Sequence, residues 1–166
     1  MKIGDKVLYG ASGVMTIVDI REESVADVCR NYYVLRPTLA KTESLTFVPA
    51  DNEKLSGNML PLLTKEEILS FLHGAKEIPP VKWIKENRAR QDFFKKIMES
   101  GDREKMIAMI LAIEENSALR EKEGKKSFLT DENAKQKAKR LLYSEIAVVF
   151  GIPEEEVASF VDREIK

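Results

Sequence analysis

The residues of this chain that could do chemistry are few, and their spacing does not suit catalysis. The stretches Gly10-Ala-Ser-Gly13 and Gly124-Lys-Lys-Ser127 each lack part of the glycine and Lys-Ser/Thr pattern of a phosphate-binding loop, so we interpret both as turns. A nucleophilic Ser12 needs an imidazole, and the single histidine, His73, lies far along the chain. Acidic pairs such as Glu66-Glu67 fall at expected helix starts, where they favour the helix dipole. We therefore expect a protein that is not an enzyme.

The composition excludes several further classes of protein. Cys29 is the only cysteine, so it cannot form an internal disulfide, and with one histidine it cannot complete a structural zinc site. No apolar run approaches the roughly 18 to 20 residues that cross a bilayer, and the N-terminal segment is strand-like. We expect a globular cytoplasmic protein with no cofactor, no metal, no membrane contact and no small-molecule substrate.

The charge is distributed unevenly along the chain, although the net charge is only −1. Residues 76–140 hold 17 basic and 12 acidic side chains, whereas residues 141–166 hold 2 basic and 6 acidic ones. A basic segment beside an acidic tail is either a nucleic-acid-binding face or a solvated helix surface, and charge alone favours the solvated surface. The pI of about 6.0 lacks the basicity of a strong independent DNA-binding protein.

The elements that must position any binding residues fall into two groups. The first 50 residues are rich in Val, Ile, Tyr and Thr and are punctuated by turn residues, which predicts four short strands. The expected strands are Asp5 to Tyr9, Val14 to Ile20, Cys29 to Leu35 and Leu45 to Val48. They predict a small, strongly bent antiparallel sheet or partial barrel.

From Thr64 onward the apolar period is that of helices, and starts and stops are marked. The first expected helix begins at a Thr64 cap, with Glu67 as capping-box partner, and ends at Gly74; the second runs from about Val81 to Ser100, before Gly101. The third runs from an Asp102 cap to Gly124, the fourth runs from a Thr130 cap to Gly151, and the fifth begins at Pro153. The apolar stretch Met106 to Ile113 predicts the most buried helix. The sequence thus predicts an α+β protein, with a β domain over residues 1–60 and an all-α bundle over residues 61–166.

Several motifs, in this order and spacing, resemble the CarD/CdnL family of bacterial RNA-polymerase-binding transcription regulators, whose N-terminal module is similar to the polymerase-binding domain of transcription-repair coupling factors. The N-terminal motifs are Gly4-Asp5-Lys6-Val7, Tyr9, Gly13-Val14, Tyr32-Tyr33-Val34-Leu35, Val48-Pro49 and Gly57. The C-terminal motifs are Trp83, Ser100-Gly101-Asp102, Lys137-Ala138-Lys139-Arg140 and Glu145-Ile146-Ala147.

The resemblance implies a Tudor-like N-terminal domain that docks on the RNA polymerase β subunit, and a helical domain that contacts promoter DNA at the upstream edge of the melted bubble. In the family the docking extends a sheet edge, which here implies contacts from Leu45, Thr46, Phe47 and Val48. Phe47 replaces a basic residue found before Val-Pro in other members. It therefore either packs on the partner or lies in the core.

The predicted DNA contacts come from the basic helical half: Trp83, Lys82, Lys85, Arg88, Lys135, Lys137 and Lys139. Helical spacing places Trp83 on the side of Phe94, which favours a core residue. The resemblance implies instead a wedge against an unpaired base step, and it decides our preference. The main alternative function is an adaptor that docks on polymerase without DNA contact. A stand-alone sequence-specific DNA-binding protein fits poorly, because no recognition helix stands out.

Overall fold

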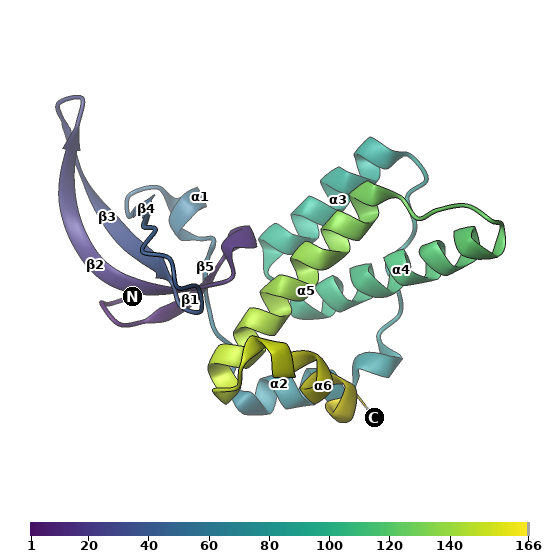
Figure 1. The fold of residues 1–166 in the computed structure, drawn as a ribbon. Helices are drawn as coiled ribbons and strands as arrows, with labels where there is room; N and C mark the ends of the chain where they lie inside the picture. The colour runs from purple at the N-terminus through teal and green to yellow at the C-terminus, as the bar shows by residue number, and fades with distance from the viewer. Residues whose placement is uncertain (166) are drawn as a thin grey trace.

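The structure is a computed structural model that describes residues 1–165, and it contains an N-terminal sheet followed by helices (Figure 1). This confirms the predicted α+β class. The sheet is antiparallel in the order β4-β3-β2-β1-β5. Its strands are β1 (Lys6–Tyr9), β2 (Val14–Val25), β3 (Val28–Pro37), β4 (Thr46–Pro49) and β5 (Met59–Pro61).

The sheet differs from the prediction in two places. The predicted strands stop at Ile20 and resume at Cys29, but β2 and β3 continue between these residues as a long hairpin that curves away from the helices (Figure 1). Its turn places Ala26 and Asp27 at φ 51° and 62°, a two-residue turn without the glycine that usually signals it. The fifth strand, β5, was not predicted, because three residues ending in a proline carry no alternation.

The sheet encloses a small apolar core on one face. A register shift between Ile17 and Asp19 places a bulge in β2, which bends the strand over this core. The core residues are Val7, Met15, Ile17, Leu35, Val48 and Met59.

The helices form a bundle around the long helix α5 (Figure 1). They are α1 (Glu53–Ser56), α2 (Lys65–His73), α3 (Asn87–Ser100), α4 (Arg103–Lys122), α5 (Leu129–Phe150) and α6 (Glu154–Glu164), with 3-10 turns η1 (Gly10–Ser12) and η2 (Ala75–Glu77). α3 and α4 pack on α5 and on each other, while α2 and α6 pack together beside the C-terminal part of α5.

Several predicted helix boundaries are confirmed. Thr64 and Glu67 form the predicted capping box, with both reciprocal hydrogen bonds present. Gly101 ends α3 in the left-handed region, and the Asp102 side chain then accepts the Lys105 N–H at the start of α4. The centre of α4 is buried on nearly all sides, as its apolar stretch predicted.

Two predicted helix starts are wrong. The helix expected from about Val81 begins at Asn87, because Val81 N–H donates to the Ala108 carbonyl (3.1 Å) and the chain stays irregular up to Glu86. The α5 cap is Phe128 and not Thr130, since α5 already begins at Leu129. We call residues 81–86 the linker segment.

A packed joint connects the sheet to the bundle. Leu8 and Val14 of the sheet belong to the same buried cluster as Phe94 and Met109 of the helices. At this joint Gly13 has φ 79° and ψ −149°, and α5 passes directly over it. The predicted boundary after residue 60 falls inside β5, just before this junction is crossed.

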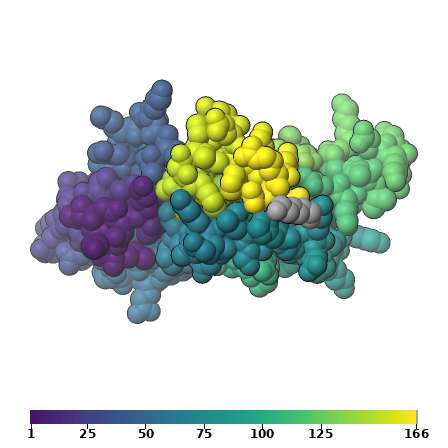
Figure 2. All heavy atoms as spheres, turned by 90° about the horizontal axis from the view of Figure 1, so that it is seen from below, coloured from purple at the N-terminus to yellow at the C-terminus, as the bar shows by residue number. Residues whose placement is uncertain are grey.

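A second set of contacts ties the end of β5 to the helices. Arg103 donates to both carboxylate oxygens of Glu145 (2.7 and 3.0 Å) and to the Pro61 carbonyl (3.1 Å), while Glu145 also accepts the Leu63 N–H (2.9 Å). The molecule is elongated, with the sheet at one end and the α4–α5 tip at the other (Figure 2).

Candidate functional site

The strand predicted as a docking edge, β4, does lie at an edge of the sheet and pairs only with β3. The hydrogen bond from Ala50 N–H to the Asn31 carbonyl (2.8 Å) marks which residues bond inward. Since bonded pairs alternate along an antiparallel ladder, Val48 and Thr46 bond to β3, while the N–H and C=O of Phe47 point away from the sheet. The edge therefore offers free main-chain groups at Phe47.

This free edge is short. The next outward position along β4 is Pro49, which has no N–H, and its carbonyl accepts the Asn52 N–H (3.4 Å). A partner strand can add only a few main-chain bonds here, so side chains must supply much of the contact.

The side chains beside the free edge form an aromatic and cationic cluster on the outer face of the sheet. Phe47 is 43% exposed and packs edge-to-face on Tyr32, with ring centroids 6.3 Å apart. The Arg21 guanidinium lies 5.1 Å from the Phe47 ring centroid and forms an ion pair with Glu23 (2.8 Å). Phe47 is thus not a core residue, and its contact with a partner stays a prediction.

The four predicted docking residues divide between the two faces of the sheet. Leu45 and Phe47 are exposed, whereas Thr46 is half-buried and Val48 is fully buried in the β core. Sequence reasoning missed Tyr32 and Arg21, because their position beside Phe47 depends on the strand register.

The outer face continues toward the hairpin tip as a strip in which the charged pair Glu23 and Arg30 is followed by the apolar pair Val25 and Val28. Val25 and Val28 are 61% and 50% exposed and pair across the end of the hairpin. Two shallow hollows lie on this strip, and both are lined by Val25 and Tyr32. Exposed apolar side chains beside a free strand edge are typical of a protein-binding surface.

Trp83, the predicted DNA wedge, lies in the linker segment and not in a helix. Its half-buried ring packs edge-to-face on Phe94, with centroids 6.3 Å apart. The Arg90 guanidinium covers the ring at 4.6 Å from the centroid. Trp83 is therefore anchored on the bundle core while part of its ring stays exposed.

A buried charge network stands behind Trp83. Arg90 and Asp131 are 1% and 2% exposed, and Arg90 Nε donates to Asp131 Oδ1 (3.0 Å). Gln91 Nε2 donates to the same oxygen (2.7 Å). The second carboxylate oxygen of Asp131 has no hydrogen-bond partner within residues 1–165. Sequence reasoning missed this network, because a helical arginine on a charged surface gives no sign of burial.

The predicted DNA-binding cations do not form one surface. Lys82, Lys85 and Arg88 are exposed around Trp83, and none of them has an ion-pair partner in the described part of the chain. Lys135 and Lys139 lie on another face, where they form ion pairs with Glu132 (2.9 Å) and Glu114 (3.4 Å). The hydrogen bond from Lys135 also lowers the pKa of Glu132.

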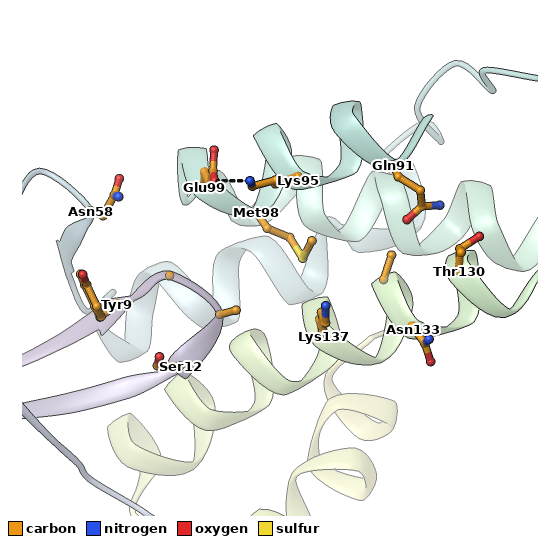
Figure 3. A pocket seen from close by; sticks show the side chains of 13 residues that line it. Tyr9, Ser12, Asn58, Gln91, Lys95, Met98, Glu99, Thr130, Asn133 and Lys137 are labelled. Carbon is orange, nitrogen blue, oxygen red and sulfur yellow. Dashed lines mark ion pairs between the residues drawn. The ribbon is translucent and has the colours of Figure 1, made fainter. Parts of the chain in front are cut away.

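Lys137 lies on the opposite side of α5 from Lys135, since two residues along a helix turn by about 200°. It faces a cleft of about 540 Å³ between the η1 turn, α3 and α5 (Figure 3). Lys95 lines the same cleft from α3 and pairs with Glu99 (3.8 Å). The structure thus separates Lys137 from the cations around Trp83.

The carboxylate of Glu86 ends the linker segment by capping α3. It accepts the N–H groups of Arg88 (3.0 Å) and Ala89 (2.6 Å). Both hydrogen bonds lower the pKa of Glu86, and the bond from the Ala89 N–H contributes most. This cap fixes the point at which the linker segment joins the helix.

Within residues 1–165 no group of His, Cys, Asp and Glu side chains could hold a metal ion. In the same residues, no helix has the length and apolar character that crossing a membrane requires.

Comparison with known proteins places the sheet in a family. Residues 1–61 match the family model of the CarD-like/TRCF RID domain, a family of RNA polymerase-interacting domains. None of the curated proteins compared with the chain matches it. The matched range ends with β5, so it contains the whole sheet and its free edge. The N-terminal sheet, residues 1–61, is therefore similar to the CarD-like/TRCF RID domain.

Proposed function

We propose that the protein is a non-enzymatic cytoplasmic transcription regulator that docks on the RNA polymerase β subunit and contacts promoter DNA at the upstream edge of the bubble, stabilising the open complex. The observation that carries the proposal is the free main-chain edge at Phe47, on a domain of the RNA polymerase-interacting family.

Docking proceeds by strand addition. The partner strand pairs with the free N–H and C=O of Phe47, and main-chain bonds of this kind supply affinity with little dependence on sequence. The exposed rings of Phe47 and Tyr32, with Arg21 beside them, supply selectivity through the outer face. The cluster resembles an interface hot spot in its residue types, since aromatic residues and arginine dominate such spots.

The DNA contact comes from the linker segment. The exposed part of the Trp83 ring stacks on an unpaired base, and the exposed cations Lys82, Lys85 and Arg88 hold neighbouring phosphates. A ring that fits melted DNA and not closed duplex shifts the equilibrium toward the open complex by its differential affinity. Lys135 and Lys139 play a smaller part in this proposal, because carboxylates already neutralise them.

The alternative is an adaptor that docks on polymerase without touching DNA. The packing of Trp83 on Phe94 and Arg90 favours it, because that packing alone accounts for an apolar ring at this position. The two functions differ in one measurable respect: only the first makes open-complex lifetime depend on Trp83.

Docking is tested by the pair Phe47→Pro and Phe47→Ala in the full chain. Both remove the ring, and only the proline also removes the outward N–H. In co-purification with RNA polymerase, Phe47→Ala should weaken binding and Phe47→Pro should weaken it further. Equal recovery of polymerase by the two variants and the unaltered protein would refute docking at this edge. A proline at Thr46 would not test docking, because the Thr46 N–H bonds inward to β3 and its loss would disturb the sheet itself.

The DNA contact is tested by Trp83→Ala with polymerase and a promoter fragment. We expect polymerase recovery to be unchanged and the open complex to decay faster. Lys54→Ala, an exposed cation in α1 of the other domain, is the matched surface control. An open-complex lifetime unaffected by Trp83→Ala would favour the adaptor.

A further inference from the structure

We infer that Arg90 is a positioning residue for Trp83: together with Asp131 and Phe128 it fixes the linker segment and the plane of the indole ring. The inference rests on the proposed function for its consequence at the promoter. Its structural part, that Arg90 holds the ring, stands on contacts within the chain.

The guanidinium of Arg90 binds the linker segment directly. Its Nη1 donates to the main-chain carbonyls of Ile84 (2.9 Å) and Lys85 (3.1 Å), the two residues that follow Trp83. Nη2 donates to Asn87 Oδ1 (3.0 Å), at the start of α3. Because α3 begins only at Asn87, these carbonyls have no helical N–H to accept, and Arg90 takes the place of the missing helical turn.

The same guanidinium lies between two aromatic rings. Its carbon is 4.6 Å from the Trp83 centroid and 5.2 Å from the Phe128 centroid. The Arg120 guanidinium also lies over the Phe128 ring, 3.9 Å from its centroid, and donates to the Lys126 carbonyl (2.8 Å). These cation–π contacts connect Trp83, Arg90, Phe128 and Arg120 in a series from the linker segment to the α4–α5 connection.

The ion pair with Asp131 fixes the position of the Arg90 guanidinium. A charge as deeply buried as Arg90 persists only when it is paired and its donors are bonded, and Asp131 on α5 supplies the pair. The guanidinium is planar and its donors form a rigid fork, so fixing its Nε and both terminal nitrogens also fixes its plane. A lysine in this place would be a point charge without that fork. The orientation of Trp83 is thus set by a group that does not touch DNA.

Trp83 is the only tryptophan of the chain, so its fluorescence reports on its own position. The main test variant is the double substitution Arg90→Gln with Asp131→Asn, which removes both charges and leaves no lone buried carboxylate. We expect a red shift of tryptophan emission, a higher acrylamide quenching constant, and an open-complex lifetime shortened toward that of Trp83→Ala. Phe128→Ala, which removes a ring already 38% exposed, should give intermediate changes.

The control for a merely structural effect is Leu72→Ala, a cavity in the α2–α5–α6 cluster. It should lower the melting temperature but leave emission, quenching and open-complex lifetime as they are in the unaltered protein. A folded Arg90→Gln/Asp131→Asn protein with unchanged emission and quenching would overturn the inference, and so would an unchanged lifetime where Trp83→Ala shortens it. If Trp83→Ala itself leaves the lifetime unchanged, the proposed DNA contact fails, and the fluorescence still decides whether Arg90 holds the ring.

Discussion

Replacing Gly13 with alanine should destabilise the protein more than the same change at Gly10, which lies three residues earlier at the start of the η1 turn. Gly13 has φ 79° and ψ −149°, a region open essentially to glycine alone, and a side chain there costs about 1–3 kcal/mol. Its new Cβ would also lie 2.9 Å from Ser144 Oγ on α5, and such overpacking costs about 1–3 kcal/mol more. The expected loss is thus about 2–6 kcal/mol, a large part of the roughly 5–15 kcal/mol typical of a domain.

Gly10 is the matched control, because it has φ 48° and nothing lies near its added Cβ. Gly10→Ala should cost about 1–2 kcal/mol, the penalty of the left-handed region. Urea denaturation gives both values. The Ser144→Ala variant then tests the contact itself, since removing Oγ should make Gly13→Ala less costly by about 0.5–3 kcal/mol in a double-mutant cycle. A Gly13→Ala protein as stable as Gly10→Ala, or a cycle without coupling, would refute this account of the joint.

Three further outcomes are expected. Removing Arg103 while Glu145 stays buried should cost about 3–5 kcal/mol in urea denaturation, and a loss below about 1 kcal/mol would contradict a clamp between β5 and the bundle. Because folding lowers the pKa of Glu86, its cap stabilises the fold above the unfolded pKa, and this stabilisation is lost as the pH falls through the folded pKa. Glu86→Gln should therefore flatten the acid limb of a curve of unfolding free energy against pH, and an unchanged acid limb would argue against the cap. The free protein should bind duplex DNA weakly, without sequence preference and with strong salt dependence, and tight, salt-resistant binding of one duplex in a titration would contradict this.

The sequence allowed prediction of those elements whose signals are local. Thr64 with Glu67, and Gly101 with Asp102, mark helix ends by hydrogen bonds between near neighbours, and the structure has all of them. The α3 start was wrong because its cap is Glu86, a residue type that rarely caps helices, and because the preceding carbonyls bond to the Arg90 side chain. That bond joins groups whose meeting depends on the tertiary fold.

The candidate site was likewise predictable in part. The edge strand and the exposed cations near Trp83 followed from the resemblance and are placed as expected at the edge and on the surface. Which face of β4 each residue occupies depends on the register with β3, and which groove of the bundle Lys137 faces depends on how α5 packs against α3 and α4. Neither the strand register nor the packing of α5 can be derived from the spacing of residues along one segment.

The packed joint between sheet and bundle has a consequence for the strength of the proposed promoter contact. Had a flexible linker joined the two parts, docking on polymerase would raise the effective concentration of Trp83 at the DNA only to the level that the linker length permits. Here Leu8 and Val14 are shared with the helical core, so docking fixes orientation as well as distance. The entropy of aligning the indole with the DNA is then lost during folding and not during binding. Under the proposed function, one ring that binds DNA only weakly can therefore act at a promoter, and loosening the joint should weaken that action even when both surfaces are intact.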